Sequence, residues 1–157
     1  MKFISPSRGS MSLDAVFADI QGYINLQPEA EYRLIIGTDS QGRHQTLFVT
    51  AVIIHRVGRG ARYFYCKRKH RPMESLRQRI YYETSLSLEV AARLTYLLSQ
   101  ANMEELSLEI HLDIGANGET KSLVRELVGM VMGSGFAARI KPYATGASTV
   151  ADKHTKG

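Results

Sequence analysis

The spacing of hydrophobic positions changes several times along this chain, and each change marks a different element of secondary structure. Apolar residues recur every three or four positions over 13–26, which predicts an amphipathic helix capped by Ser12. Residues 31–38 and 45–56 have continuous apolar centres, and residues 61–67 carry a run of aromatic side chains. Short turns separate these three stretches, so they predict three strands that pair antiparallel.

The second half of the chain alternates between helical and extended patterns. Residues 74–100 predict one long helix, and residues 106–114 alternate apolar and polar as a strand does. A helix over 119–133, a short strand over 136–141 and a last helix from Ser148 complete the order.

This order predicts an α/β fold with a five-stranded mixed sheet, in which three antiparallel strands precede alternating helices and strands. Helices are expected on both faces of that sheet. A length of 157 residues corresponds to one domain, residues 1–157. We expect residues 1–11 to form a loose arm, and the arm and first helix together (residues 1–28) to lie outside the core.

The composition indicates a class of binding partner and a cellular compartment for the protein. Lys and Arg number 20 against 15 Asp and Glu, giving a net charge of +5 and a pI of about 9.4. This excess suits a polyanion such as nucleic acid. No apolar run is long enough to span a membrane, and the N-terminus lacks the apolar segment of a signal peptide. Cys66, which we expect to be a structural residue, is the single cysteine, so a reducing cytoplasm is the expected location.

Two acidic residues stand at the ends of predicted strands. Asp39 follows the apolar centre Ile35-Ile36-Gly37-Thr38, and Asp113 follows His111-Leu112 near the end of the fourth predicted strand. If these strands are parallel neighbours, both carboxylates emerge at one edge of the sheet, where open α/β sheets bind their ligands.

A third carboxylate comes from the long helix, where Glu83 and Glu89 are the alternatives. At about 100° per residue, Glu83 falls in the apolar sector that includes Ile80 and Ser87, whereas Glu89 falls nearly opposite Ile80. An inward carboxylate needs a partner, and a metal ion is one. Glu83 is therefore the preferred third acid.

Carboxylates that converge repel one another unless a cation lies among them. Oxygen ligands without a cluster of Cys or His suit Mg²⁺ or Mn²⁺, and a pair of such ions can activate water and stabilise the leaving oxygen of a phosphodiester. Taken singly, an Asp at a strand end is usually a turn former and a Glu on a helix is usually solvated. The combination of the three acids with the predicted order of strands favours a nuclease.

The order of strands and helices, with acids on the first strand, the long helix and the fourth strand, resembles the ribonuclease H fold. More specifically, the chain resembles the YkuK-like family of small bacterial ribonuclease H-like proteins. The resemblance covers nearly the whole chain and is carried by Tyr32–Gln41, Glu83–Leu86, Glu89–Ala91, His111–Gly115 and Ile140–Pro142.

The resemblance implies a catalytic and metal-binding set of Asp39, Glu83 and Asp113, with Asp152 of the last helix as a fourth acid. It implies a metal-dependent nuclease that uses Mg²⁺ or Mn²⁺ and acts on RNA, an RNA/DNA hybrid or branched DNA. Whether Asp152 or Glu89 joins the site is left open, as is the oligomeric state.

Basic side chains supply candidate contacts to nucleic acid. A compact positive run follows the aromatic stretch at 63–65, and Lys121 stands in a glycine-containing segment before a predicted helix, where backbone N–H groups suit a phosphate. The candidates are Lys67, Arg68, Lys69, Arg71 and Lys121.

Two other functions remain open. The first is a nucleic-acid-binding module that keeps the fold without catalysis, because fold alone does not fix function. The second is a protein-interaction scaffold that uses the arm and the helix over 13–26.

Overall fold

The computed structural model describes residues 1–42, 44–115, 118–141 and 146–155, and in its last helix the side chains of residues 146–149 and 152 lie outside that description. No helix among the described residues is both long and apolar enough to cross a membrane. The elements, in chain order, are β1 (Lys2–Ser5), β2 (Gly9–Ser12), α1 (Leu13–Leu26), β3 (Tyr32–Gln41), β4 (Thr46–Arg56), β5 (Gly60–His70), α2 (Leu76–Gln100), β6 (Ser107–Gly115), the 3₁₀ turn η1 (Lys121–Leu123), α3 (Val124–Gly133), β7 (Ala137–Lys141) and α4 (Gly146–Thr155).

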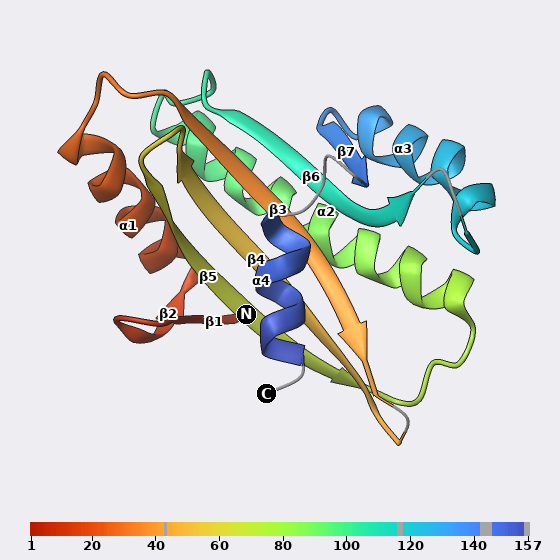
Figure 1. The fold of residues 1–157 in the computed structure, drawn as a ribbon. Coiled ribbons are helices and arrows are strands. Elements are labelled where there is room, and N and C mark those ends of the chain that lie inside the picture. Colours follow the sequence, from red (N-terminus) through yellow and green to blue (C-terminus); the bar gives the residue numbers. More distant parts are fainter. Residues whose placement is uncertain (43, 116–117, 142–145, 156–157) are drawn as a thin grey trace.

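One mixed sheet organises the described part of the chain, with its seven strands in the order β2-β1-β5-β4-β3-β6-β7. Strands β3, β4 and β5 pair antiparallel, and β6 and β7 run parallel to β3. The mixed α/β sheet is thus confirmed, but the expected number of five strands is wrong. The two additional strands, β1 and β2, come from the N-terminal segment (Figure 1).

The N-terminal segment is a β-hairpin rather than a loose arm. Phe3 pairs with Met11 and is fully buried, and Ile4 pairs with Tyr65 of β5. Gly9 has a φ of +72°, a backbone conformation that glycine adopts without steric cost. Strands of four residues are too short to show a period, so the sequence pattern did not reveal them.

Helices cover both faces of the sheet, as expected (Figure 1). On one face, Leu34 and Ile36 of β3 belong to the main hydrophobic cluster, which they share with residues of α1, α2 and α3. On the other face, Ile35 packs with Val150 of α4. Successive residues of a strand point to opposite faces, so odd-numbered residues of β3 face α4 and even-numbered ones face α2.

Helix α1 packs against the sheet and contributes side chains to the main hydrophobic cluster. The Oγ of Ser12 accepts a hydrogen bond from the backbone N–H of Ala15 at 3.1 Å, which caps the helix as predicted. Val16 and Ile20 are fully buried within the main hydrophobic cluster, which also contains Phe3. Residues of the N-terminal hairpin and of α1 therefore contribute to the main hydrophobic cluster.

Two strands extend further than their hydrophobic centres. β3 continues to Gln41, so Asp39 is paired with Val49 in the sheet rather than placed in a turn. β5 continues to His70, so most of the basic run lies within a strand. Pairing with β4 stabilises both extensions, and the local hydrophobic pattern of a segment does not reveal such pairing.

An ionic network around the buried Glu109 joins β6 to its neighbours. Glu109 of β6 is 2% exposed, and both of its carboxylate oxygens accept hydrogen bonds from Nη2 of Arg33 on β3, at 2.8 and 2.9 Å. His111 Nε2 lies 2.7 Å from Oε1 of Glu109, and Arg139 Nε on β7 lies 3.9 Å from Oε2. The network lies on the strand that carries Asp113, four residues after Glu109.

Candidate functional site

The C-terminal end of β3 presents alternating polar side chains to the two faces of the sheet. Asp39 faces α4, and Oγ1 of Thr155 on that helix lies 3.5 Å from its Oδ2. Thr38 and Ser40 face α2 and are buried. The strand thus carries carboxylate and hydroxyl groups at neighbouring positions on opposite faces.

Helix α2 is anchored to β3 by polar contacts on both sides of Glu83. One turn after Glu83, the buried Oγ of Ser87 lies 2.8 Å from Oγ1 of Thr38. One turn before it, Nη2 of Arg79 donates to the backbone oxygen of Ser40 at 2.8 Å. These contacts hold the carboxylate of Glu83 at the end of β3.

The hydrogen-bond directions around Ser40 are fixed by chemistry. The guanidinium of Arg79 can only donate, and its Nε and Nη2 both lie 3.2 Å from Oγ of Ser40. The hydroxyl of Ser40 therefore directs its own proton to Oε2 of Glu83, which is its second partner. This arrangement orients Glu83 through a serine that is itself held by an arginine.

The other two acids influence the protonation of Glu83. Burial, together with the charges of Asp39 and Asp113, raises the pKa of Glu83 to about 8, against the lowering effects of Ser40 and Arg79. The three acids named from the sequence come from β3, α2 and β6. Asp113 lies two residues after His111, which pairs with Gly37, and Asp39 lies two residues after Gly37.

Asp113 has a cationic partner that was not among the predicted site residues. Nζ of Lys141, the last residue of β7, lies 2.7 Å from Oδ1 of Asp113. The hydrogen bond and charge of Asp113, with the charge of Asp39, raise the pKa of Lys141. A register shift between β6 and β7 sets Lys141 beside Gly115 instead of Asp113, and the side chain reaches back to the carboxylate.

These residues fit a divalent ion in donor type but have not gathered around one position. Carboxylate oxygens at the edge of a sheet are suitable ligands for Mg²⁺ or Mn²⁺. Across the part of the chain that the structure describes, however, no three His, Cys, Asp or Glu side chains are placed so that they could hold a metal ion. One carboxylate of the set is instead paired with Lys141.

The remaining acidic candidates are placed as follows. Glu89 lies away from Glu83 on α2, where its oxygens are 3.9 Å from Arg68 and 3.7 Å from Arg93. The side chain of Asp152 lies outside the described residues, although its backbone belongs to α4.

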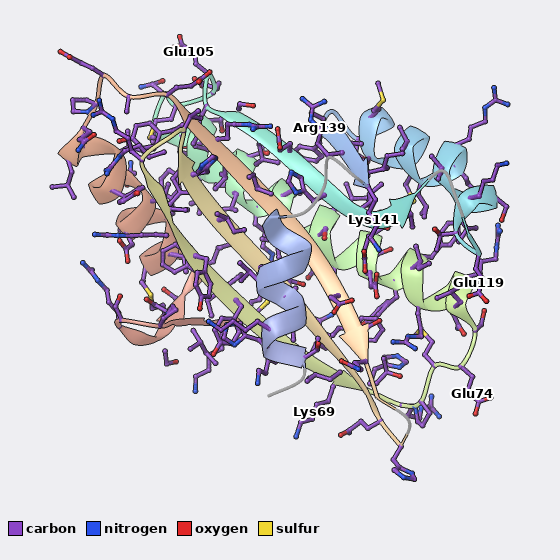
Figure 2. All side chains as sticks on the ribbon, viewed as in Figure 1. Lys69, Glu74, Glu105, Glu119, Arg139 and Lys141 are labelled. Carbon is purple, nitrogen blue, oxygen red and sulfur yellow. The ribbon has the colours of Figure 1, made fainter. Side chains whose placement is uncertain are left out.

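The basic candidates on β5 divide between the two faces of the sheet. Lys67 is opposite Val49 of β4, which is in turn opposite Asp39 of β3, so this row places Lys67 on the same face as Asp39. Lys69 follows two residues later on that face, whereas Arg68 points to the α2 side and approaches Glu89. Figure 2 labels Lys69 and Lys141, which lie on opposite sides of β3.

The last two basic candidates are exposed and lie outside the sheet. Arg71 follows the end of β5, and Lys121 begins η1.

Cys66 does not behave as a reactive thiol. Burial raises its pKa to about 11, so the thiolate, which is the nucleophilic form, is scarce near neutral pH.

Three residues next to the acids were not predicted as site residues. Arg79 precedes Glu83 by one helical turn, Ser40 follows Asp39 directly, and Lys141 ends the short strand over 136–141. The spacing of Arg79 and the adjacency of Ser40 were available signals. The pairing of Lys141 with Asp113 depends on the β6–β7 register, which the sequence does not display.

Replacement of Glu83 by Gln is expected to stabilise the metal-free protein at alkaline pH. Because the folded pKa of Glu83 is raised from 4.5 to about 8, ionisation opposes folding, and stability is lost as the pH rises from 4.5 through about 8. At pH 8, E83Q should be more stable by about 2 kcal/mol, since the partial exposure of the side chain reduces the full effect of the shift.

Urea denaturation in the presence of EDTA measures this difference. The gap between E83Q and the wild type should close by pH 4. A gap that is the same at pH 4 and pH 8 would contradict the role given to ionisation.

The amino-acid sequence is similar to that of known proteins. A scan against models of protein families matches residues 15–156 to the family described as Ribonuclease H-like. The Bacillus subtilis (strain 168) protein named "Uncharacterized protein YkuK" is 38% identical over 168 residues, which cover 98% of this chain and 96% of that relative. Among solved structures there is no significant match.

Proposed function

This chain belongs to the Ribonuclease H-like family, and we propose that it is a metal-dependent nuclease that hydrolyses phosphodiester bonds of nucleic acid. The observation that carries the proposal is the placement of three carboxyl groups at one end of the sheet. Asp39 and Asp113 each lie two residues beyond the Gly37–His111 pair of the parallel strands β3 and β6, and Glu83 contacts Ser40, the residue after Asp39.

The residues that would hold the ion are Asp39, Glu83 and Asp113, with Asp152 as the fourth acid that the family resemblance implies. Mg²⁺ or Mn²⁺, when bound, supplies a Lewis acid that activates water and neutralises charge on the phosphodiester. The protein contributes the placement of the ligands, since Arg79 and Ser40 fix the orientation of the Glu83 carboxylate.

The basic side chains support a polyanionic substrate at this face. Neighbouring strands lie about 4.8 Å apart, so the row from Asp39 through Val49 to Lys67 spans about 10 Å. Lys67 and Lys69 can therefore contact the backbone of a strand whose phosphodiester lies near the acids. RNA, an RNA/DNA hybrid and branched DNA are all candidate substrates.

Incubation of labelled RNA, RNA/DNA hybrid and branched DNA with the protein tests the proposal. We expect shorter fragments from at least one of them with Mn²⁺ or Mg²⁺, and none when EDTA is present. Intact substrates under all conditions would contradict a nuclease.

A binding module without catalysis is the second candidate. The contact that favours it is the ion pair between Lys141 and Asp113, which gives one carboxylate a partner within the protein. A module of this kind would bind the same nucleic acids equally well with EDTA and with Mn²⁺, and would leave them intact.

Loss of the two lysines on the α4 side of β5 is expected to weaken nucleic-acid binding. K67Q/K69Q should raise the Kd about tenfold at low salt and reduce the slope of log K against log salt by about two, because two phosphate contacts are lost.

Fluorescence anisotropy with a labelled strand measures this effect. R93Q/R125Q is the matched control, because it removes the same charge from exposed positions on α2 and α3. Equal weakening by both double variants would mean that net charge, and not this face, governs binding.

A further inference from the structure

A lysine of β7 contacts Asp113, one of the proposed metal ligands. Nζ of Lys141 lies 2.7 Å from Oδ1 of Asp113, a distance typical of a short charge-assisted hydrogen bond. The side chain of Asp113 is 30% exposed and that of Lys141 is 55% exposed. The pair is therefore accessible, and the lysine has room to leave.

The lysine also interacts with the second strand acid. The hydrogen bond and charge of Asp113, and then the charge of Asp39, raise the pKa of Lys141. Converging carboxylates need a nearby cation. Lys141 meets this need at the β6 side of the site, as Arg79 does through Ser40 at the α2 side.

We propose that Lys141 is the resident counter-ion of the acidic site and competes with the divalent cation for Asp113. The inference rests on the proposed function, since it takes Asp39, Glu83 and Asp113 as the metal ligands. It accounts for the finding that the described acids do not form a three-carboxylate group, because Asp113 is oriented toward β7. Binding of the metal then requires the ammonium to leave this carboxylate.

A supporting role for Lys141, in contrast to competition, predicts the opposite change in metal affinity. If the lysine served to orient Asp113 as a ligand, its removal would weaken metal binding, as the loss of other supporting contacts does. If it competes, its removal frees an oxygen of Asp113 and eliminates a repulsive positive charge a few ångströms from the ion. The sign of the change in Mn²⁺ affinity therefore separates the two roles.

Titration with Mn²⁺ in the absence of nucleic acid, followed by electron paramagnetic resonance of the free ion, tests the inference. K141Q should bind Mn²⁺ roughly tenfold more tightly than the wild type at low salt, the size expected for one charge near a divalent ion. K141R keeps the charge and should stay within twofold of the wild type. R125Q removes one charge from an exposed site on α3 and should do the same.

An unchanged or weaker affinity in K141Q would overturn the inference, provided that its far-ultraviolet circular dichroism matches the wild type. If K141Q does not fold, K141M is measured in the same way. Mn²⁺ binding with the expected ratio but without cleavage of any substrate would reject the nuclease and keep the counter-ion role. Absence of Mn²⁺ binding in every protein would reject both.

Discussion

Replacement of Asp39 by Asn is expected to reduce metal-dependent cleavage by more than about 100-fold. The change keeps the shape of the side chain and removes one of the three carboxylates that β3, α2 and β6 carry at the same end of the sheet. Loss of a residue that only supports a metal ligand costs about 10- to 100-fold in affinity or activity, so loss of a ligand should cost more. The amide oxygen of Asn can still accept from Thr155, so the contact between β3 and α4 is preserved.

Initial rates with a labelled substrate and Mn²⁺ measure the effect of D39N. D14N is the matched control, because Asp14 is exposed in the first turn of α1. Nucleic-acid binding by D39N should equal or exceed that of the wild type, since a negative charge is removed near the phosphates. Cleavage by D39N within threefold of the wild-type rate would remove Asp39 from the catalytic set.

Truncation of Glu109 to Ala is expected to destabilise the protein by about 3–5 kcal/mol. Glu109 is buried, and its removal leaves the buried His111 and the partly exposed Arg33 without their hydrogen-bond acceptor. For a chain of this size, the melting temperature should fall by about 10 °C. E89A, which breaks two longer and partly exposed ion pairs, should cost less than about 1 kcal/mol.

The effect of Glu109 should depend on pH. Burial acts to raise its pKa, but hydrogen bonds from His111 and Arg33 outweigh burial, and the pKa is lowered from 4.5. The stabilisation is therefore complete above pH 4.5 and is lost as the pH falls through the lower folded pKa. Burial also lowers the pKa of His111, so the neutral ring donates from Nε2 to Glu109. Chemical denaturation at pH 7 and pH 3 measures the loss of stability in E109A and its dependence on pH. Equal stability of E109A and E89A at pH 7 would contradict the stabilising role given to Glu109.

Much of the central fold could be predicted from the sequence because its elements are long. The strands β3, β4 and β5 and the helix α2 each span 10 residues or more, so the apolar centres of the strands and the period of the helix stand out in the sequence. The family resemblance drawn from the same residues is confirmed. The hairpin of β1 and β2 escaped prediction because each of its strands has four residues, and its single pair with β5 depends on tertiary contact.

The acids could be chosen from sequence because strand ends and helix faces follow from periodicity. The choice of Glu83 over Glu89 used only the 100° turn of a helix, and the structure places Glu83 beside Ser40 and Glu89 beside two arginines. The partners of the acids were harder to predict. Lys141 lies beside Gly115 after a register shift between β6 and β7, and only its side chain reaches back to Asp113. The contact of Arg79 with Ser40 joins α2 to β3, although the spacing of Arg79 from Glu83 was a signal in the sequence.

If Asp39, Glu83 and Asp113 form a metal centre, diffraction from a crystal soaked in Mn²⁺ will reveal it. We expect anomalous difference peaks among these three carboxylates, together with a Lys141 ammonium that has moved away from Asp113. A map without such a peak, in which Nζ of Lys141 still lies against Oδ1 of Asp113, would contradict a metal centre at these residues.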